Sequence, residues 1–173
     1  MRHFYKSLGE VYKDNVDVII CETMASIYEG ITSATMAKNY SPRVWLSWTT
    51  RGNKLNRLPS TELLEDAISK GSELDIECQL VNCVHADTAS KAIIKLKDQN
   101  KFGIYANSSI YRKNELEGFI SDADEFHYHN HQPIDHIEYK KFVEEWVEAG
   151  AYIVGGCCRT SIKHIEEIKK IIK

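Results

Sequence analysis

The sequence lacks the features that mark several large classes of protein. No apolar leader follows the first residues, and no hydrophobic run is long enough to cross a bilayer. There is no phosphate-binding loop and no dinucleotide fingerprint, which argues against nucleotide-dependent enzymes. The net charge is −3, with acidic and basic residues interspersed. Without a basic stripe, nucleic acid is not an expected partner. We therefore expect a cytoplasmic protein with reduced thiols and no membrane association.

The chain also lacks a low-complexity linker that would divide it. It has 173 residues, of which 43% are hydrophobic, enough to bury one sizeable core. A single domain over residues 1–173 is the prediction. Its one long irregular region runs from about residue 107 to 136.

Short apolar segments alternate with amphipathic ones along the chain. The apolar segments predict buried strands at Val16–Cys21, Val44–Trp48, Ile76–Cys83, Phe102–Ala106 and Tyr152–Val154. Helical spacing occurs near residues 3–14, 26–39, 60–70, 86–99, 137–149 and 161–172. In the last of these, one apolar stripe is formed by Ile162, Ile165, Ile168 and Ile172. Strands that alternate with helices predict an α/β fold with a parallel sheet covered on both faces.

Three cysteines lie at the predicted carboxyl ends of strands. Cys83 closes one strand, and Cys157 and Cys158 follow another directly after Gly155 and Gly156. Adjacent residues of a regular strand point to opposite faces, so two neighbouring cysteines bind one metal only where the backbone turns. The two glycines permit that turn, because glycine reaches backbone angles closed to other residues. Since the carboxyl ends of parallel strands converge, the three thiols are expected to meet.

Three thiolates suggest a Zn²⁺ site with one open position. Structural zinc sites usually have four protein ligands, whereas sites with three leave the fourth position to water or substrate. A fourth thiolate in such an electron-rich site remains a good nucleophile, which suits alkylation of a substrate thiol. The simpler interpretation is that the pair packs as small residues at a strand end. A disulfide is disfavoured by strain between adjacent cysteines and by the odd total of five. Cys21 and Cys78, inside apolar runs, are predicted core thiols.

Several motifs together resemble the zinc-dependent homocysteine S-methyltransferase family, and the resemblance runs through nearly the whole chain. The most specific motif is the Gly-Gly-Cys-Cys-Arg-Thr run at its C-terminal side. The motifs are Asp17–Thr23, Trp45–Thr49, Val81–Cys83, Tyr105–Ser108 and Gly155–Thr160. The resemblance implies a (β/α)₈ TIM barrel in which Cys83, Cys157 and Cys158 bind the zinc.

The same resemblance implies one substrate-binding residue, and position beside a ligand suggests a second. Glu22 matches a family glutamate that holds the amino group of homocysteine, although a carboxylate there could instead cap the next helix. Asn82, beside a ligand, is expected to orient that ligand or the substrate, the alternative being a role in satisfying backbone groups at the strand end. Backbone amides near Arg159 to Ser161 are candidates for binding an amino-acid carboxylate.

The implied activity is methyl transfer from S-methylmethionine or S-adenosylmethionine to homocysteine, which forms methionine and belongs to methionine biosynthesis. Betaine and methyl-folate remain open as donors, and the same ligand set would serve an alkyl transferase acting on another thiol.

One departure from the family is the number of strands. A TIM barrel has eight strands and typically about 250 residues, whereas about five parallel strands with flanking helices are predicted here. We therefore expect a partial (β/α)₈ barrel, a homocysteine-binding domain truncated at its N-terminal side. Self-association or a separate N-terminal half could complete it. The alternative is a catalytically inactive zinc-binding fragment or one half of a split barrel.

Two further signals receive less weight. His127, His129 and His131 alternate and would share one side of an extended segment, but a solvated loop is preferred over a second metal site. Trp48 is expected to pack within the fold, and its place near a strand end also makes it a candidate to line the pocket.

Overall fold

The computed structural model describes residues 1–50, 56–99, 101–111 and 131–172. The helices are α1 (Arg2–Tyr12), α2 (Ile27–Ala37), α3 (Leu64–Ser72), α4 (Ala86–Leu96), α5 (His136–Glu148) and α6 (Ile162–Lys169). The strands are β1 (Ile19–Met24), β2 (Val44–Trp48), β3 (Cys78–His85), β4 (Phe102–Asn107), β5 (Ser109–Tyr111), β6 (His131–Pro133) and β7 (Ile153–Gly156).

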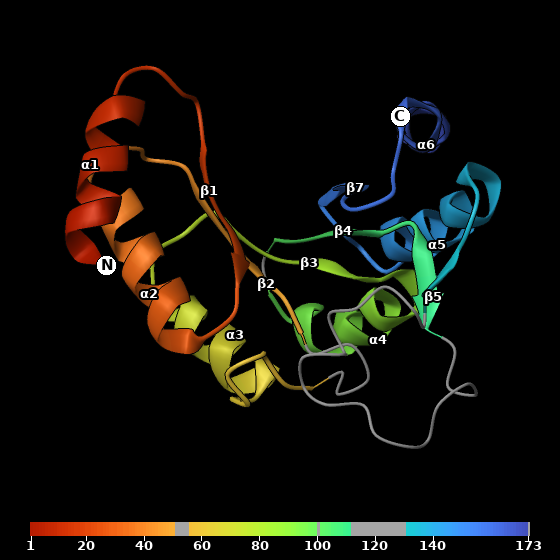
Figure 1. Ribbon diagram of the computed structural model, residues 1–173, viewed down its shortest axis with the longest axis horizontal. Coiled ribbons are helices and arrows are strands. Elements are labelled where there is room, and N and C mark those ends of the chain that lie inside the picture. The colour runs from red at the N-terminus through yellow and green to blue at the C-terminus, as the bar shows by residue number, and fades with distance from the viewer. Residues whose placement is uncertain (51–55, 100, 112–130, 173) are drawn as a thin grey trace.

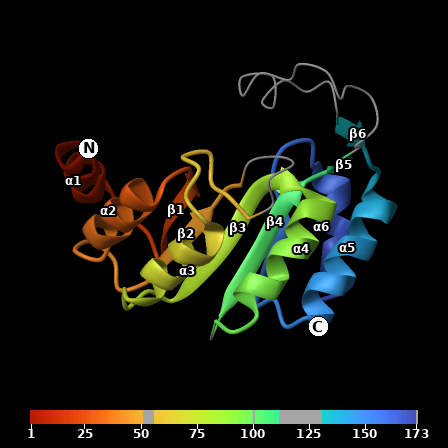
Figure 2. The same cartoon turned by 90° about the horizontal axis from the view of Figure 1, so that it is seen from below.

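Five strands form one parallel sheet in the order β1-β2-β3-β4-β7 (Figure 1). The helices follow one another along this sheet, from α1 and α2 at the β1 end to α5 and α6 at the β7 end (Figure 2). This architecture confirms the predicted α/β fold with about five parallel strands and flanking helices. At the two ends of the sheet, β1 and β7 each pair with one neighbour in the described chain.

Alternation along the strands separates a face packed on the helices from an opposite face that includes Ser47 and Asn82. In β2, Leu46 and Trp48 are fully buried on the helix side, and Trp45 and Ser47 therefore point to the opposite face. Trp48 packs so closely on α2 that a β-carbon at Gly30 would lie 2.3 Å from its ring. Its indole N–H donates to Gln79 Oε1 at 3.0 Å. The idea that Trp48 lines the pocket is therefore wrong, since its ring is enclosed between sheet and helix.

The structure shifts the first predicted strand toward the C-terminus. β1 runs from Ile19 to Met24 and not from Val16, which is exposed, so Glu22 lies inside the strand and not after it. The strand is irregular there: its register with β2 shifts between Cys21 and Met24, and Thr23 has a φ of 59°. The long region after β4 also contains two short antiparallel strands, β5 and β6, which the sequence pattern did not predict.

The apolar stripe of the last helix proves to be only partly buried. Ile168 is buried with His164 in α6, which packs on α5. Ile162 is 78% exposed, and Ile165 and Ile172 are also exposed. Helical spacing places these isoleucines on related faces, but burial requires a neighbouring element, and the described chain has one on the Ile168 side alone. In the part of the chain that the structure describes, no helix is both long and apolar enough to span a membrane.

Candidate metal centre

Cys83 lies near the carboxyl end of β3 in an unusual backbone conformation. Its φ is 56°, and the pairing of β3 with β4 shifts register between Asn82 and His85. A positive φ is uncommon for residues other than glycine, and such conformations concentrate at functional sites. The bulge allows Cys83 to leave the regular alternation of the strand, so its thiol reaches the end of the sheet.

Cys157 and Cys158 lie in the turn that follows β7, and hydrogen bonds fasten this turn to β4. The N–H of Cys157 donates to Ala106 O at 2.8 Å, and the Cys158 carbonyl accepts from the N–H of Ser108 at 3.0 Å. Within the turn, the Thr160 hydroxyl donates to Cys157 O at 2.7 Å. The end of β4 thus holds both cysteines in place.

The two glycines before the cysteines do not act as expected. Among the described residues, Gly150 is the one glycine with a positive φ, so neither Gly155 nor Gly156 supplies a special backbone angle. Gly156 is needed for space, because a β-carbon there would lie 2.5 Å from Thr160 Cγ2. The left-handed residue of the turn is Arg159, with a φ of 65°.

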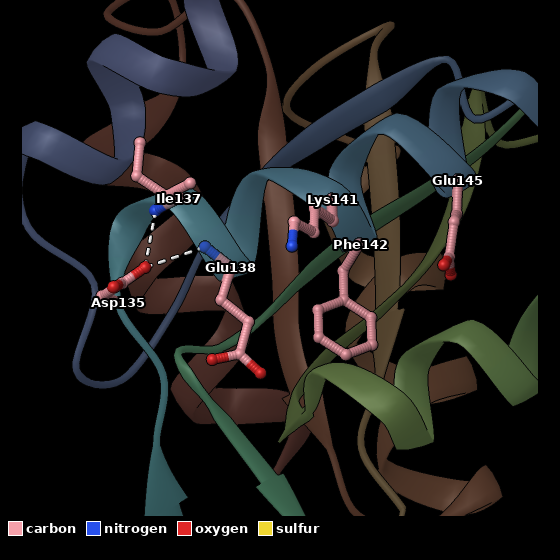
Figure 3. Close-up of a pocket in the computed structure, with 6 residues that line it drawn as sticks. All are labelled: Asp135, Ile137, Glu138, Lys141, Phe142 and Glu145. Carbon is pink, nitrogen blue, oxygen red and sulfur yellow. Dashed lines mark hydrogen bonds between the residues drawn. The ribbon is translucent and has the colours of Figure 1, made fainter.

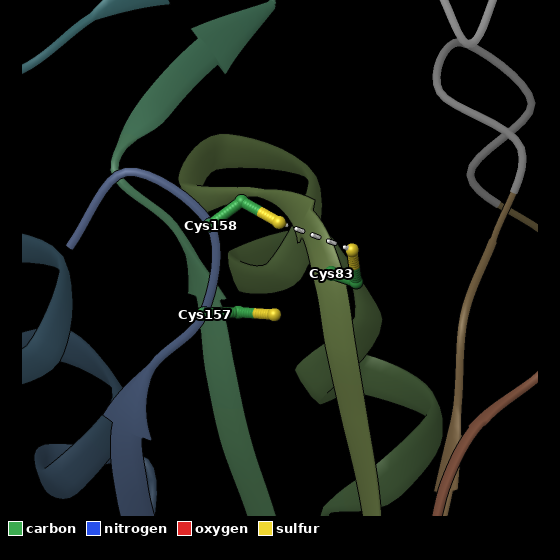
Figure 4. A group of neighbouring side chains, drawn as sticks. All are labelled: Cys83, Cys157 and Cys158. Atoms are coloured by element: carbon green, nitrogen blue, oxygen red, sulfur yellow. Dashed lines mark hydrogen bonds between the residues drawn. The ribbon is translucent and has the colours of Figure 1, made fainter.

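The three thiols converge as the sequence predicted. The sulfur atoms of Cys83, Cys157 and Cys158 all lie within 4.8 Å of one another, and Cys83 Sγ is 3.8 Å from Cys158 Sγ (Figure 4). Tetrahedral zinc with Zn–S bonds of about 2.3 Å separates two of its sulfurs by about 3.8 Å. Both the donor set and its spacing therefore fit a zinc ion. Their role as ligands stays a prediction.

Mutual hydrogen bonding polarises the thiol cluster. Hydrogen bonding from the Cys83 thiol lowers the pKa of Cys157 to about 6, against the opposing effect of burial, and Asn82 contributes in the same direction. The pKa of Cys83 is raised for the reciprocal reason, first by its hydrogen bond to Cys157 and then by burial. Negative charge is therefore stabilised on Cys157, the form in which a cysteine binds a metal.

Asn82 is fully buried and connects three strands beneath the cysteines. Its Oδ1 accepts from the Ser47 hydroxyl at 2.6 Å and from the N–H of Thr23 at 3.2 Å. Its Nδ2 donates to Thr23 Oγ1 at 2.7 Å. These contacts support the structural alternative, in which Asn82 satisfies groups at the strand ends, and its effect on Cys157 agrees with orientation of a ligand. Direct substrate contact by Asn82 remains a prediction.

The backbone amides before α6 are already occupied. The N–H of Thr160 donates to Cys157 O at 3.3 Å, and the N–H of Ser161 donates to His164 Nδ1 at 3.1 Å. This second contact belongs to a capping box formed by Ser161 and His164. A substrate carboxylate would therefore have to displace bonds that the chain makes to itself, which weakens the expectation of a carboxylate site there.

The histidine run and a cavity along α5 are two further features to place. His127 and His129 lie outside the described residues, and His131 begins β6. A cavity of about 440 Å³ along α5 contains no cysteine, and the Asp135 carboxylate on it caps the helix by accepting from the N–H groups of Ile137 and Glu138 (Figure 3). Its lining residues are Asp135, Ile137, Glu138, Lys141, Phe142 and Glu145.

Asn107 is a positioning residue that the sequence reasoning missed. Its Oδ1 accepts from the N–H of Cys158 at 3.1 Å. The signal was its place at the end of an apolar strand, where a polar side chain can bond neighbouring backbone. Since loss of an outer-shell partner lowers metal affinity about 10–100-fold, Asn107→Ala should weaken zinc binding about tenfold. Competition with a chromophoric chelator measures this change.

Asn39→Ala is the matched control for that experiment. Asn39 is an exposed asparagine at the end of α2 whose side chain also bonds only backbone, at Thr35 O and Met36 O. It should leave zinc affinity unchanged. Equal affinities of both variants for zinc would show that the Asn107 contact does not hold Cys158.

Comparison with known proteins identifies sequences that are similar to this chain. Residues 1–172 match the family model for homocysteine S-methyltransferase. A homocysteine S-methyltransferase of Escherichia coli is 24% identical over 169 residues, covering 96% of this chain and 51% of the relative. A selenocysteine methyltransferase of Astragalus bisulcatus is 24% identical over 178 residues, covering 99% of this chain and 49% of the relative. The chain thus spans about half the length of the curated relatives it matches.

The fold is similar to that of a solved homocysteine methyltransferase from Escherichia coli in its apo form. The TM-score is 0.70 at 19% sequence identity, and the match covers 98% of this chain and 57% of that one. The five-stranded sheet therefore corresponds to part of that protein's fold.

Proposed function

The chain belongs to the homocysteine S-methyltransferase family, and on that premise we propose that it provides the zinc-binding part of an enzyme that methylates homocysteine to methionine. The observation that carries this proposal is the convergence of Cys83, Cys157 and Cys158 at the end of the parallel sheet. A site of three thiolates with one open position suits a thiol substrate better than a carbonyl or water substrate. One matched relative is named for selenocysteine, so a selenolate is the first alternative acceptor to compare.

In the proposed reaction, Cys83, Cys157 and Cys158 would hold the metal. The incoming thiol would have its pKa lowered by a zinc ion held there, so that its sulfur would be a nucleophile near neutral pH. The substrate sulfur then attacks the methyl carbon of a sulfonium donor, S-methylmethionine or S-adenosylmethionine. A carbon–sulfur bond forms on the acceptor, the donor's bond to the methyl breaks, and its electron pair leaves with the neutral thioether. The acceptor's thiol proton passes to solvent, and no general acid is required.

Glu22 is the proposed anchor for the amino group of homocysteine. It is exposed on β1, and alternation places it on the face opposite the buried Cys21, where Ser47 and Asn82 also lie. Within the described residues, Glu22 makes no ion pair that would neutralise its carboxylate. A carboxylate on this face beside the thiol cluster suits recognition of an ammonium group. The α2 N-cap is Ser26, which removes the alternative that Glu22 caps this helix.

Closure of the pocket belongs to the proposal as well. Because β1 and β7 each have one neighbour in the described chain, we propose that further strands complete the wall, from a second copy or from a separate N-terminal half. The five cysteines are free thiols in the structure, which agrees with a reducing, cytoplasmic location. The alternative is a zinc-binding fragment without catalysis, and the open sheet favours it.

The test measures zinc per chain and methionine formed from homocysteine, with S-methylmethionine and then S-adenosylmethionine as donor. We expect one zinc per chain, turnover with at least one donor, and loss of turnover after chelation. At subsaturating homocysteine, Glu22→Gln should lower the rate about tenfold or more, because it removes a charge-assisted hydrogen bond to the amino group. Stoichiometric zinc without turnover would instead establish the inactive fragment or half-enzyme.

A further inference from the structure

Tyr105 carries a buried hydroxyl that the centre described so far leaves without a function. Its side chain extends from β4 on the face that bears Asn82, since Asn82, Tyr105 and Gly155 lie in register across neighbouring parallel strands. Among the described residues, the Tyr105 hydroxyl has no hydrogen-bond partner of acceptable geometry, although it is shielded from solvent. Buried hydroxyls are nearly always bonded, so an unbonded one in a site requires an explanation.

The polar groups around Tyr105 have mostly used their hydrogen-bonding capacity. The Ser47 hydroxyl donates its single proton to Asn82 Oδ1, and Asn82 also accepts from Thr23 and donates to it. The Ser47 proton is thus used on Asn82, although the Ser47 hydroxyl lies close enough to Tyr105 to lower the pKa of Tyr105. The Tyr105 proton is itself still available, so this hydroxyl is positioned to act as a donor to a neighbouring acceptor.

Glu22 is the neighbouring acceptor with the greatest strength. Burial raises the pKa of Tyr105 most, the Ser47 hydroxyl lowers it, and the nearby charges of Glu22 and Cys157 raise it further, so that the net shift is upward and the hydroxyl stays protonated. The same carboxylate is exposed and makes no ion pair in the described chain, so it is free to adopt more than one orientation. A carboxylate binds an ammonium group more tightly when a neutral donor already holds one of its oxygens in the binding orientation.

We propose that the Tyr105 hydroxyl donates a hydrogen bond to the Glu22 carboxylate and orients it toward the amino group of the amino-acid thiol. Tyr105 is then a positioning residue that acts through Glu22, and it makes the site selective for thiols that carry an α-amino group. This inference rests on the proposed function, because it uses Glu22 as the amino anchor.

The experiment compares two thiols on the cobalt-loaded chain. Co²⁺ replaces zinc, and its absorption bands report binding of a fourth sulfur without any turnover. L-Homocysteine is titrated against 4-mercaptobutyrate, which has the same thiol and carboxylate but no amino group. Tyr105→Phe should weaken homocysteine binding about tenfold, the size of one hydrogen bond to a charged group. Its affinity for 4-mercaptobutyrate should stay within about twofold of the original chain's.

Tyr139→Phe is the matched control. Its hydroxyl is also buried near the site, but it donates to the backbone carbonyls of Ala106 and Gly155 at 2.8 and 2.9 Å. Any loss of thiol affinity in this variant would come from a structural change, and it should be equal for homocysteine and 4-mercaptobutyrate. Cobalt loading of each variant shows that the centre has formed.

A double-mutant cycle with Glu22→Gln tests whether Tyr105 acts through Glu22. In that background, Tyr105→Phe should change homocysteine affinity no further, because the two residues act as one unit. Additive losses, or equal losses for both thiols, would overturn the inference and leave the proposed function standing. If the original chain shows no spectral change with homocysteine, the proposed function fails, and this inference fails with it.

Discussion

Replacing Cys157 by alanine is expected to lower zinc affinity by more than about 100-fold, because loss of an outer-shell partner alone costs about 10–100-fold. Cys157 is the thiol on which the cluster stabilises negative charge, with a pKa lowered to about 6 by its hydrogen bond from Cys83. Its removal takes away one of three sulfurs and leaves only the Cys83–Cys158 pair, whose sulfurs are 3.8 Å apart. Zinc per chain after dialysis, followed by competition with a chelator, measures the effect.

Cys21→Ala controls for the loss of a cysteine as such. Cys21 is buried in the core, on the helix side of β1. The variant should bind zinc as the original chain does, even if it is somewhat less stable. Zinc retained with unchanged affinity by Cys157→Ala would show that the converging thiols are not the metal site and would remove the basis of the proposed function.

Trp48→Ala should lower the free energy of unfolding by about 3–5 kcal/mol, the usual cost of deleting a large buried aromatic side chain. Trp48 is completely buried, fills the space above Gly30 and donates to Gln79. The substitution therefore creates a cavity between β2 and α2 and leaves the buried Gln79 oxygen without this donor. Urea denaturation followed by circular dichroism measures the loss.

Tyr28→Ala provides the comparison on α2 itself. Tyr28 is 66% exposed, so its truncation should change the free energy of unfolding by less than about 0.5 kcal/mol. A loss below about 1 kcal/mol for Trp48→Ala would mean that the ring does not occupy the core between the sheet and α2.

Much of the candidate site followed from the sequence because parallel strands share one carboxyl edge. Cys83 and Cys158 are 75 positions apart, yet both follow apolar segments, and that placement was enough to predict that their sulfurs meet. The strands of the parallel sheet and their alternation with helices were predictable because the patterns of strands and helices are local in sequence. Runs of β-branched and aromatic residues form buried strands in many contexts.

Other features depended on which surfaces face each other. The spacing of Ile162, Ile165 and Ile168 is helical whichever side is covered, but α6 packs on α5 and β7, and in that packing Ile168 is buried and Ile162 stays exposed. Likewise, alternation put Trp48 and Ser47 on opposite faces of β2 without indicating which face the helices would cover. The close approach of Thr160, and not a special backbone angle, accounts for glycine at position 156.

The sequence by itself determined the α/β order of elements and the presence of three thiols at strand ends, since both are written in residue type and local spacing. Only the tertiary structure decided that Asn82 joins three strands, that Asn107 holds the Cys158 amide, and that the Tyr105 hydroxyl remains unbonded beside Glu22. The physical reason is that each of these facts is a contact between strands distant in sequence. A side chain's partner depends on the positions of atoms that no local pattern specifies.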